Sequence, residues 1–290
     1  MHLTPLKPSS IHILCQGQEA LVRVPAGMVV ESPIELGLEA SNSEAPISLR
    51  IEVGKGSKAT VVVRLEGDAH LKSLEFKQTI VAEEGSQLRV VEFQALSTST
   101  TFIAHRDSEA KKEASLENIV IQIGGQTTEG TLNQKANGSE VKLNPAIFIL
   151  AKTTQRHRFN LNNFFAQEMG GGNSTIKCIA QDQSSIETLG TIGIGRHGTG
   201  TESGLRMDSL LLSREARIAA TPALEIGTND VKVGHGASVS NLNEENMFYL
   251  ASRGIAPDEA RRMMVRGFVS DVTDRLNDLP ELRDEILSLI

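Results

Sequence analysis

Aromatic residues are scarce in this chain, which has no tryptophan, one tyrosine and nine phenylalanines among its 290 residues. So few large side chains fill the core of a β-sandwich poorly. Long hydrophobic runs are also missing, since no stretch approaches the roughly 18 apolar residues that a membrane span needs. We therefore expect no membrane association.

Cysteine is nearly absent, with only Cys15 and Cys178. The first residues, MHLTPLKPSS, have none of the apolar character of a secretory signal peptide. Two cysteines without an export signal favour reduced thiols, so we expect a cytoplasmic protein. A net charge of −7 excludes nucleic acid as the default partner, because phosphate contacts need a basic surface.

The local motifs of several enzyme classes are missing too. The chain has no G-x-x-x-x-G-K-[ST], C-x-x-C, H-E-x-x-H or G-x-S-x-G pattern. We therefore expect neither catalysis nor nucleotide binding by this chain. GIGRHG (193–198) matches the dinucleotide pattern G-x-G-x-x-G, but a turn and a strand-like run follow it instead of a helix. We interpret it as a glycine-rich corner.

Short strand-like runs fill most of the sequence up to about residue 240. ATVVVRLEG (59–67), SQLRVVEFQ (86–94) and ENIVIQIGG (117–125) are examples, and many such runs alternate apolar with polar residues. The pattern predicts an all-β domain of roughly fifteen to twenty strands. RDSEAKKEASLEN (106–118) is the exception, which we expect to form a short polar helix or an exposed loop.

The architecture of this β domain stays open on pattern alone. Two-residue hairpin signals are scarce and small residues precede several strands, which favours a solenoid. No sequence repeat of fixed length is visible, so a sandwich remains an equal alternative. For a solenoid we expect Leu210, Leu211, Leu212 and Ile226 to lie in late strands, with at least half of them facing the solenoid core.

The hydrophobic period changes to that of helices after residue 240. NEENMFYLASRG reads as one helix closed by Gly254, and Pro257 begins a second. Met264, Phe268, Val272 and Leu276 would form its apolar stripe, and PELRDEILSLI a third helix. We predict a β domain over 1–240 and a helical module over 241–290.

Three histidines occur in the later β region, and one has unusual neighbours. We interpret His157 and His197 as turn or surface residues. His235 lies between Gly234 and Gly236, so a partner could approach its imidazole, which is a good ligand for iron. An ordinary turn histidine is the alternative, and we expect Cys178 to be a small buried hydrophobe.

A 48-residue stretch resembles a known family. TPALEIGTNDVKVGHGASVSNLNEENMFYLASRGIAPDEARRMMVRGF (221–268) is similar to the C-terminal part of SufB/SufD proteins, scaffold subunits of the SUF iron–sulfur cluster assembly system. DSLLLS (208–213) and VPAGMVVESPIEL (24–36) resemble them as well. The resemblance implies a right-handed parallel β-helix (a solenoid) followed by a C-terminal helical module.

The resemblance also implies partners. SufB/SufD subunits pair through their β-helices, and the helical module docks a SufC-type ATPase of the ABC type. By this likeness Phe248, Tyr249, Arg253 and Phe268 would bind the ATPase. His235 would be a metal ligand at a subunit interface, for iron or a transient iron–sulfur cluster. Alternatively, Phe248 plugs the end of the solenoid and only Tyr249 is exposed.

Two positions depart from SufB-type members. Met207 stands where those members have a cysteine, and Gly236 where they have a glutamate. The chain therefore looks SufD-like, and since strand-like sequence begins by about residue 11, we expect the resemblance not to include the helical N-terminal domain of longer members. We expect a non-catalytic scaffold that pairs with a SufB-type subunit or a second copy of itself. A structural partner of an ABC-type ATPase without a cluster role is the alternative.

Overall fold

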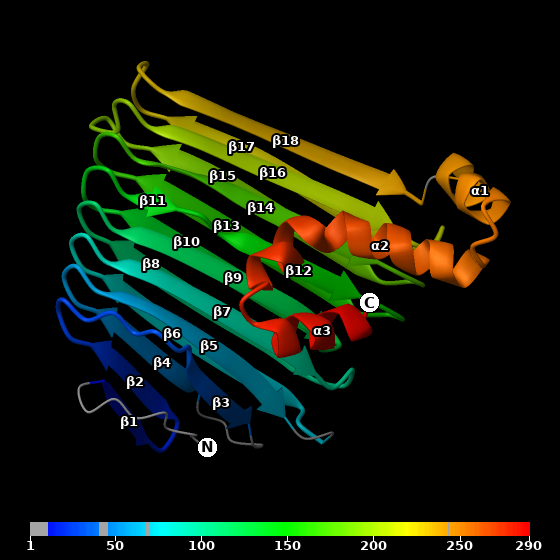
Figure 1. Ribbon diagram of the computed structural model, residues 1–290, viewed down its shortest axis with the longest axis horizontal. Coiled ribbons are helices and arrows are strands. Elements are labelled where there is room, and N and C mark those ends of the chain that lie inside the picture. The colour runs from blue at the N-terminus through cyan, green and yellow to red at the C-terminus, as the bar shows by residue number, and fades with distance from the viewer. Residues whose placement is uncertain (1–10, 41–45, 68–69, 243) are drawn as a thin grey trace.

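The computed structural model describes residues 11–40, 46–67, 70–242 and 244–290. These residues form a parallel β-solenoid of two long sheets, with helices over the outer face of one sheet (Figure 1). Sheet A contains, in spatial order, β1 (His12–Gln16), β2 (Glu19–Val24), β4 (Ile47–Val53), β6 (Ser73–Ala82), β8 (Thr101–Ala110), β10 (Thr127–Ala136), β13 (Arg156–Phe165), β15 (Ser185–Ile194) and β17 (Arg217–Ile226).

Sheet B alternates with sheet A along the chain. Its strands are β3 (Ile34–Ala40), β5 (Lys58–Gly67), β7 (Gln87–Leu96), β9 (Ser115–Gly124), β11 (Lys142–Leu143), β12 (Ala146–Ala151), β14 (Gly171–Ala180), β16 (Glu202–Leu211) and β18 (Lys232–Asn241). The two short strands β11 and β12 share one position between β9 and β14. Only the pair β1–β2 is antiparallel within the described residues. The resemblance therefore predicted the solenoid correctly.

A backbone corner recurs once per coil. It has a positive φ and comes before seven of the sheet B strands (β3, β5, β7, β9, β11, β14 and β16), at Gly27, Gly56, Gly85, Glu113, Glu140, Met169 and Gly200. The N–H group of each corner residue donates to the carbonyl oxygen of the residue just before the next corner, as from Gly56 to Glu84 at 2.9 Å. This ladder stacks the coils. The interval between corners varies from 27 to 31 residues, so no fixed repeat shows in the sequence.

Two hydrophobic cores lie on opposite faces of sheet B. The first fills the space between the sheets and includes Leu36, Ile51, Phe76 and Leu116. The second lies between the outer face of sheet B and the C-terminal helices, where Val91, Phe93, Ile121 and Phe148 meet Val269 and Ile286. Because both faces of β12 are covered, its sequence AIFILA is apolar throughout, as in other fully buried parallel strands.

Four helical elements follow β18. They are α1 (Glu244–Ser252), α2 (Pro257–Thr273), the 3₁₀ turn η1 (Asp274–Leu276) and α3 (Pro280–Ser288). Pro257 starts α2, as predicted, and Asp258 and Glu259 lie in its first turn. The buried stripe consists of Val265, Val269, Val272 and Leu276, so Met264 and Phe268 lie at its margin. None of the described helices combines the length and apolarity needed to span a membrane.

Three predictions from the sequence were wrong. Residues 106–118 form the ends of β8 and β9 around the corner at Glu113, because a solenoid turn tolerates the charged run KKE. His157 is 3% exposed inside the solenoid, and burial lowers its pKa to about 4, whereas His197 is an exposed turn residue as predicted.

The third error concerns the late leucines. Leu211 alone packs against the inner core. Leu210 is buried and Leu212 partly buried beside the helices in the second core, and Ile226 is 43% exposed. Neighbouring residues of a strand face opposite sides, so Leu210 lies on the outer face of sheet B when Leu211 lies on the inner face. Leu210 is buried there because the C-terminal helices cover that face, which the sequence did not reveal.

Candidate functional site

The last coil is the exposed end of the solenoid. Strand β17 ends sheet A and β18 ends sheet B, and neither has a further neighbour among the described strands. Most side chains of β18 are exposed, and Ile226 and Val239 are 43% and 49% exposed. Strand edges with free N–H and C=O groups and apolar side chains are templates for pairing with another chain.

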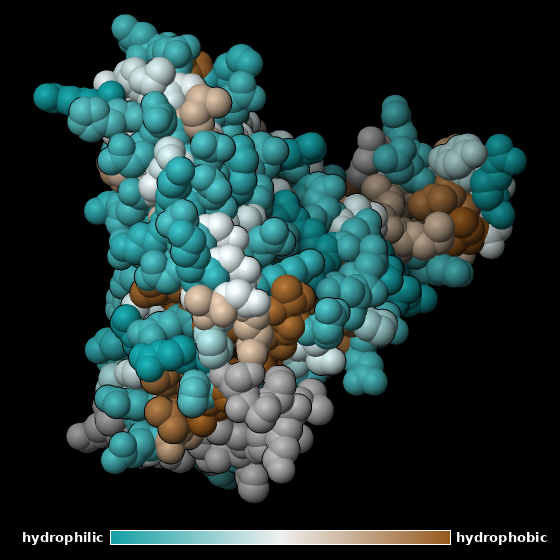
Figure 2. All heavy atoms as spheres, turned by 60° about the vertical axis from the view of Figure 1, so that its left-hand side comes forward, coloured by the Kyte–Doolittle hydropathy of each residue, from teal (hydrophilic) through white to brown (hydrophobic). Residues whose placement is uncertain are grey.

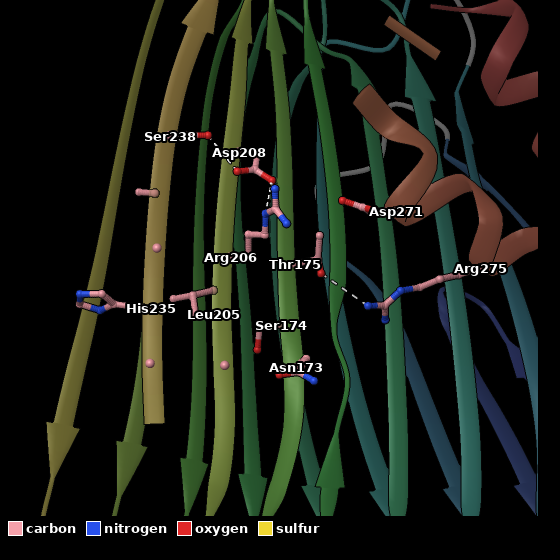
Figure 3. Close-up of a pocket in the computed structure, with 14 residues that line it drawn as sticks. Asn173, Ser174, Thr175, Leu205, Arg206, Asp208, His235, Ser238, Asp271 and Arg275 are labelled. Atoms are coloured by element: carbon pink, nitrogen blue, oxygen red, sulfur yellow. Dashed lines mark hydrogen bonds and ion pairs between the residues drawn. The ribbon is translucent and has the colours of Figure 1, made fainter. Parts of the chain in front are cut away.

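His235 lies on β18 at this exposed end. Its register partner on β16 is Leu205, which points into the solenoid, so His235 lies on the inner face of the sheet. The imidazole is exposed there because no further coil covers it, and Figure 3 shows it pointing away from the groove on the outer face. A side chain carbon added at Gly234 or Gly236 would meet no atom within 4 Å. Because neighbouring residues of a strand face opposite sides, this open space lies on the outer face, whereas the imidazole of His235 is reached from the uncovered inner face.

The two positions that depart from the SufB-type pattern fall on opposite faces. Met207 is buried on the inner face and pairs with Ala237, which makes it a diagonal neighbour of His235. Gly236 lies on the outer face beside Arg206. Within this chain, ligating side chains at these two positions would point away from each other.

No cluster of three or more His, Cys, Asp or Glu residues suited to a metal ion occurs in the part of the chain that the structure describes. Cys178 pairs with Ser209, four residues beyond Leu205, so it lies about 13 Å from His235 along the strands. Burial raises the pKa of the Cys178 thiol to about 12, although Ser209 hydrogen-bonds to it. A thiol with this pKa is a poor metal ligand, and Cys178 is the buried hydrophobe that its sequence context predicts.

A groove of about 720 Å³ runs along the outer face of the last coils, between β18 and α2. Its floor is Gly204, Gly234 and Gly236, and Asp271 and Arg275 form its helical wall (Figure 3). Arg275 is held there, with Nη1 donating to the Asn144 carbonyl at 3.1 Å and to Glu117 Oε1 at 3.2 Å. Because its floor carries no side chains at these glycines, the backbone of β18 is open to the groove.

Asp208 is the buried one of the two acidic groups of this groove, and Asp271 is the exposed one. It accepts hydrogen bonds from Lys177 Nζ at 2.8 Å, Arg206 Nε at 2.7 Å and Ser238 Oγ at 2.8 Å. Burial by itself would raise the pKa of Asp208, but the hydrogen bonds from Lys177 and Ser238 and the charges of Lys177 and Arg206 hold it below the ordinary value. Asp208 is therefore an ionised structural group near neutral pH.

Helix α1 projects from the body and carries the predicted aromatic pair. Phe248 is 77% exposed and Tyr249 56% exposed, so Phe248 does not plug the solenoid. The Arg253 guanidinium lies 5.2 Å from the centre of the Tyr249 ring. Figure 2 shows a mostly hydrophilic face with an apolar patch on this projecting arm. Exposed large apolar residues grouped on one helix mark an interaction surface.

The end of α1 is well defined. Gly254 has φ +84°, and the N–H groups of Gly254 and Ile255 donate to the carbonyls of Ala251 and Leu250. This is a Schellman motif with glycine at C′, as the sequence predicted. Phe268, the fourth predicted partner residue, lies on α2 instead, half-buried against sheet B with its ring 4.9 Å from Lys177 Nζ. The structure therefore brings Tyr249 and Arg253 together, next to Phe248, and separates Phe268 from them.

Comparison with known proteins agrees with this architecture. Residues 38–268 match the family model described as SUF system FeS cluster assembly, SufBD core domain. The chain belongs to the SufBD family.

Among its relatives in this family, the iron–sulfur cluster assembly protein SufD of Escherichia coli is 26% identical over 83% of the chain and 57% of its own length. A SufBD family protein of Mycobacterium leprae is 25% identical over 93% of the chain and 70% of its own length. The chloroplastic protein ABCI7 of Arabidopsis thaliana is 25% identical over 91% of the chain and 58% of its own length. The chain thus spans less than two thirds of the first and third of these relatives.

Sequence reasoning missed the residues that connect the groove to the helices. Lys177 is a single cation in the apolar run STIKCIA, and it is 4% exposed. A lysine at an outward position of a strand normally predicts solvent, whereas here α2 covers it. The apolar stripes predicted for the helices after residue 240 indicate that these helices cover something, but they do not indicate which strand positions they cover.

Proposed function

We propose that this SufBD family chain is a non-catalytic scaffold subunit of an iron–sulfur cluster assembly complex, and that its helix α1 docks a SufC-type ATPase. The observation that carries the proposal is the exposed aromatic pair on α1. Phe248 and Tyr249 contribute little to the fold, yet large aromatic residues with a nearby arginine are the groups that dominate interface energies. Membership of the SufBD family supports the assembly role.

The exposed end of the solenoid is the proposed pairing surface. Strands β17 and β18 each present an unpaired edge, and the exposed Val239 and Ile226 lie on them. Addition of a partner's strands would extend both sheets without remodelling the core. The partner is a SufB-type subunit or a second copy of this chain, and either would bury His235 in the interface.

Iron or a nascent cluster is the proposed cargo, and His235 its ligand from this chain. One imidazole cannot hold a metal ion, and Cys178 lies too far away to assist. The remaining donors would come from the partner subunit or from sulfide. Those same facts favour a second function, in which the chain is a structural partner of the ATPase with no cluster role.

The docking proposal is tested by replacing both aromatic residues of α1. We expect Phe248→Ala with Tyr249→Ala to weaken binding of a SufC-type ATPase by at least about 30-fold, the loss of one interface anchor worth about 2 kcal/mol. Calorimetry or surface plasmon resonance would measure it. Phe164→Ala is the matched control, since Phe164 is 41% exposed on the outer face of sheet A.

Equal binding by the double variant and the wild type would refute docking through α1. The cluster role has its own test, which is anaerobic reconstitution with iron and sulfide followed by visible absorption. If the chain binds the ATPase but takes up no iron, either alone or with its pairing subunit, the function that remains is that of a structural partner of the ATPase.

A further inference from the structure

Lys177, on the outer face of β14, is an almost fully buried amine whose partners belong to other elements. Its side chain is 5% exposed, and its Nζ lies 2.8 Å from Asp208 Oδ2 on β16 and 2.7 Å from Asp271 Oδ2 on α2. The Phe268 ring of α2 covers the amine at 4.9 Å. A buried cation is tolerated only when it is paired, so its position is tightly defined by these groups.

Asp208 extends this set of contacts to the end of the solenoid. Its second oxygen, Oδ1, accepts a hydrogen bond from Ser238 Oγ at 2.8 Å, and Ser238 is three residues beyond His235 on β18. Figure 3 shows Ser238, Asp208 and Asp271 in a row across the strands from β18 to the helix. The order of contacts is therefore Asp271, Lys177, Asp208 and Ser238, from α2 to the strand that carries His235.

Strand β18 has few other anchors. It is hydrogen-bonded to β16 on one side only among the described strands. Lys232 pairs with Glu202 at 2.6 Å, but both groups are largely exposed, and exposed pairs contribute little. Ser240 donates to the Ser209 carbonyl across a long 3.3 Å. The hydrogen bond from Ser238 to Asp208 is thus the shorter of the two side-chain hydrogen bonds that tie this strand to a buried residue.

We propose that Lys177 is a positioning residue that couples helix α2 to strand β18, so that a displacement of α2 changes the position of His235. The role rests on the proposed function, because an ATPase docked on α1 would act on α2, the helix that follows directly. When α2 moves, the carboxylate of Asp271 leaves the Lys177 amine. Lys177 then keeps one ion-pair partner, Asp208, and its own position is less tightly defined. Asp208 in turn fixes Ser238 less firmly, and β18 is free to shift at the pairing surface.

The test compares amide hydrogen exchange of β18 (232–241) in the purified chain and its variants. Asp271→Asn removes the helix contact, although Asp271 itself does not hydrogen-bond to β18. We expect Asp271→Asn and Lys177→Met to speed this exchange by at least about fivefold, the low end of couplings between sites. The variant Asp271→Glu keeps the carboxylate, so its β18 amides should exchange at the wild-type rate.

Arg64→Met is the matched control. Arg64 also joins sheet B to the helices, with Nη1 2.8 Å from Glu285 Oε2 and the guanidinium 5.5 Å from the Phe93 ring, but it lies on β5, far from β18. Its replacement should leave β18 unchanged. If Asp271→Asn and Lys177→Met change β18 no more than Arg64→Met does, Lys177 is an ordinary structural ion pair and the proposal is wrong. Because Asp271 is 52% exposed, its variant decides the matter even where Lys177→Met does not fold.

A second arm uses the complex with the ATPase. Addition of ATP should change β18 exchange in the wild type and in Arg64→Met, and should leave it unchanged in Lys177→Met, which still binds the ATPase through α1. A normal response in Lys177→Met overturns the coupling. Failure of the wild-type chain to bind the ATPase overturns the proposed function instead, and the comparison in the purified chain then decides the coupling by itself.

Discussion

Helices α1 and α2 follow one another in the chain but have opposite surroundings. Helix α2 buries Val265, Val269 and Val272 against the outer face of sheet B, whereas α1 has its main contacts with α2. The contrast extends to the aromatic residues, since Phe268 is half-buried over Lys177 and Phe248 is 77% exposed. Residues 241–290 therefore contain two functional parts, one that belongs to the core and one that is presented to solvent.

This difference changes how the helical segment should be tested. Removing residues 241–290 would take away α1, but it would also uncover Phe93, Ile121 and Phe148. A loss of partner binding in such a truncation could come from misfolding. Point substitutions that act on one part only separate docking from folding.

The largest effect is expected in the part that belongs to the core. Leu276→Ala should lower the free energy of unfolding by about 2–5 kcal/mol, because this fully buried leucine fills the second core and the cavity cannot close completely. Urea unfolding with an unchanged m-value would measure it. Phe248→Ala is the comparison on α1, where we expect a change within about 0.5 kcal/mol. Similar losses in both variants would contradict the division into two parts.

A smaller effect is expected at Asp208, which lies on β16 under the core-bound helix α2. Asp208→Asn should cost about 1.5–3 kcal/mol at pH 7, the usual value of hydrogen bonds to a charged group. The pKa of Asp208 is lower in the folded chain than its ordinary value of 3.8. Its ionised form therefore stabilises the fold fully above pH 4, and this contribution is lost as the pH falls through the folded pKa.

The wild type and Asp208→Asn should consequently differ in urea midpoint at pH 7 and converge on acidification. Midpoints measured at intervals between pH 7 and pH 2.5 would show it. A gap that stays constant down to the lowest pH would mean that ionisation of Asp208 does not stabilise the fold.

The smallest effect on stability is expected at His235. Its side chain is exposed, so His235→Ala should change the free energy of unfolding by less than about 0.5 kcal/mol. Iron bound per complex with the pairing subunit, purified without oxygen, should nevertheless fall to background, because alanine offers no nitrogen donor. Unchanged iron in the variant would make His235 an ordinary residue of an exposed strand.

Much of the candidate site could be predicted from local sequence. The aromatic pair of α1 and the capping Gly254 have the local roles that their neighbours indicate, since each depends on a few adjacent residues. The role predicted for the glycines beside His235 was wrong, because His235 lies within β18 and both glycines face the side opposite to its imidazole. Lys177 and Asp271 could not be paired in this way, because 94 residues separate them and α2 meets β14 only in the folded chain. Their contact depends on which outer strand positions the helices cover.

The corner that recurs along the coils is a second feature that local sequence does not predict. This corner needs a left-handed backbone, which Gly56 and Gly85 adopt readily, but Glu113, Glu140 and Met169 adopt it as well. The ladder of corner hydrogen bonds holds those three residues in a conformation that their side chains disfavour. Because neighbouring coils can impose the corner conformation on other residues, glycine does not occur at every corner, and the sequence shows no regular glycine motif.

By itself the sequence determined the alternating strands, the change to helices after residue 240 and the membership of the SufBD family. Period and turn residues act over a few positions, and long motifs carry a family resemblance. Only the tertiary structure decided that α2 and α3 belong to the core while α1 stays exposed, and that His235 lies on an uncovered inner face. Both outcomes depend on what lies against a strand or helix, and those neighbours come from distant parts of the chain.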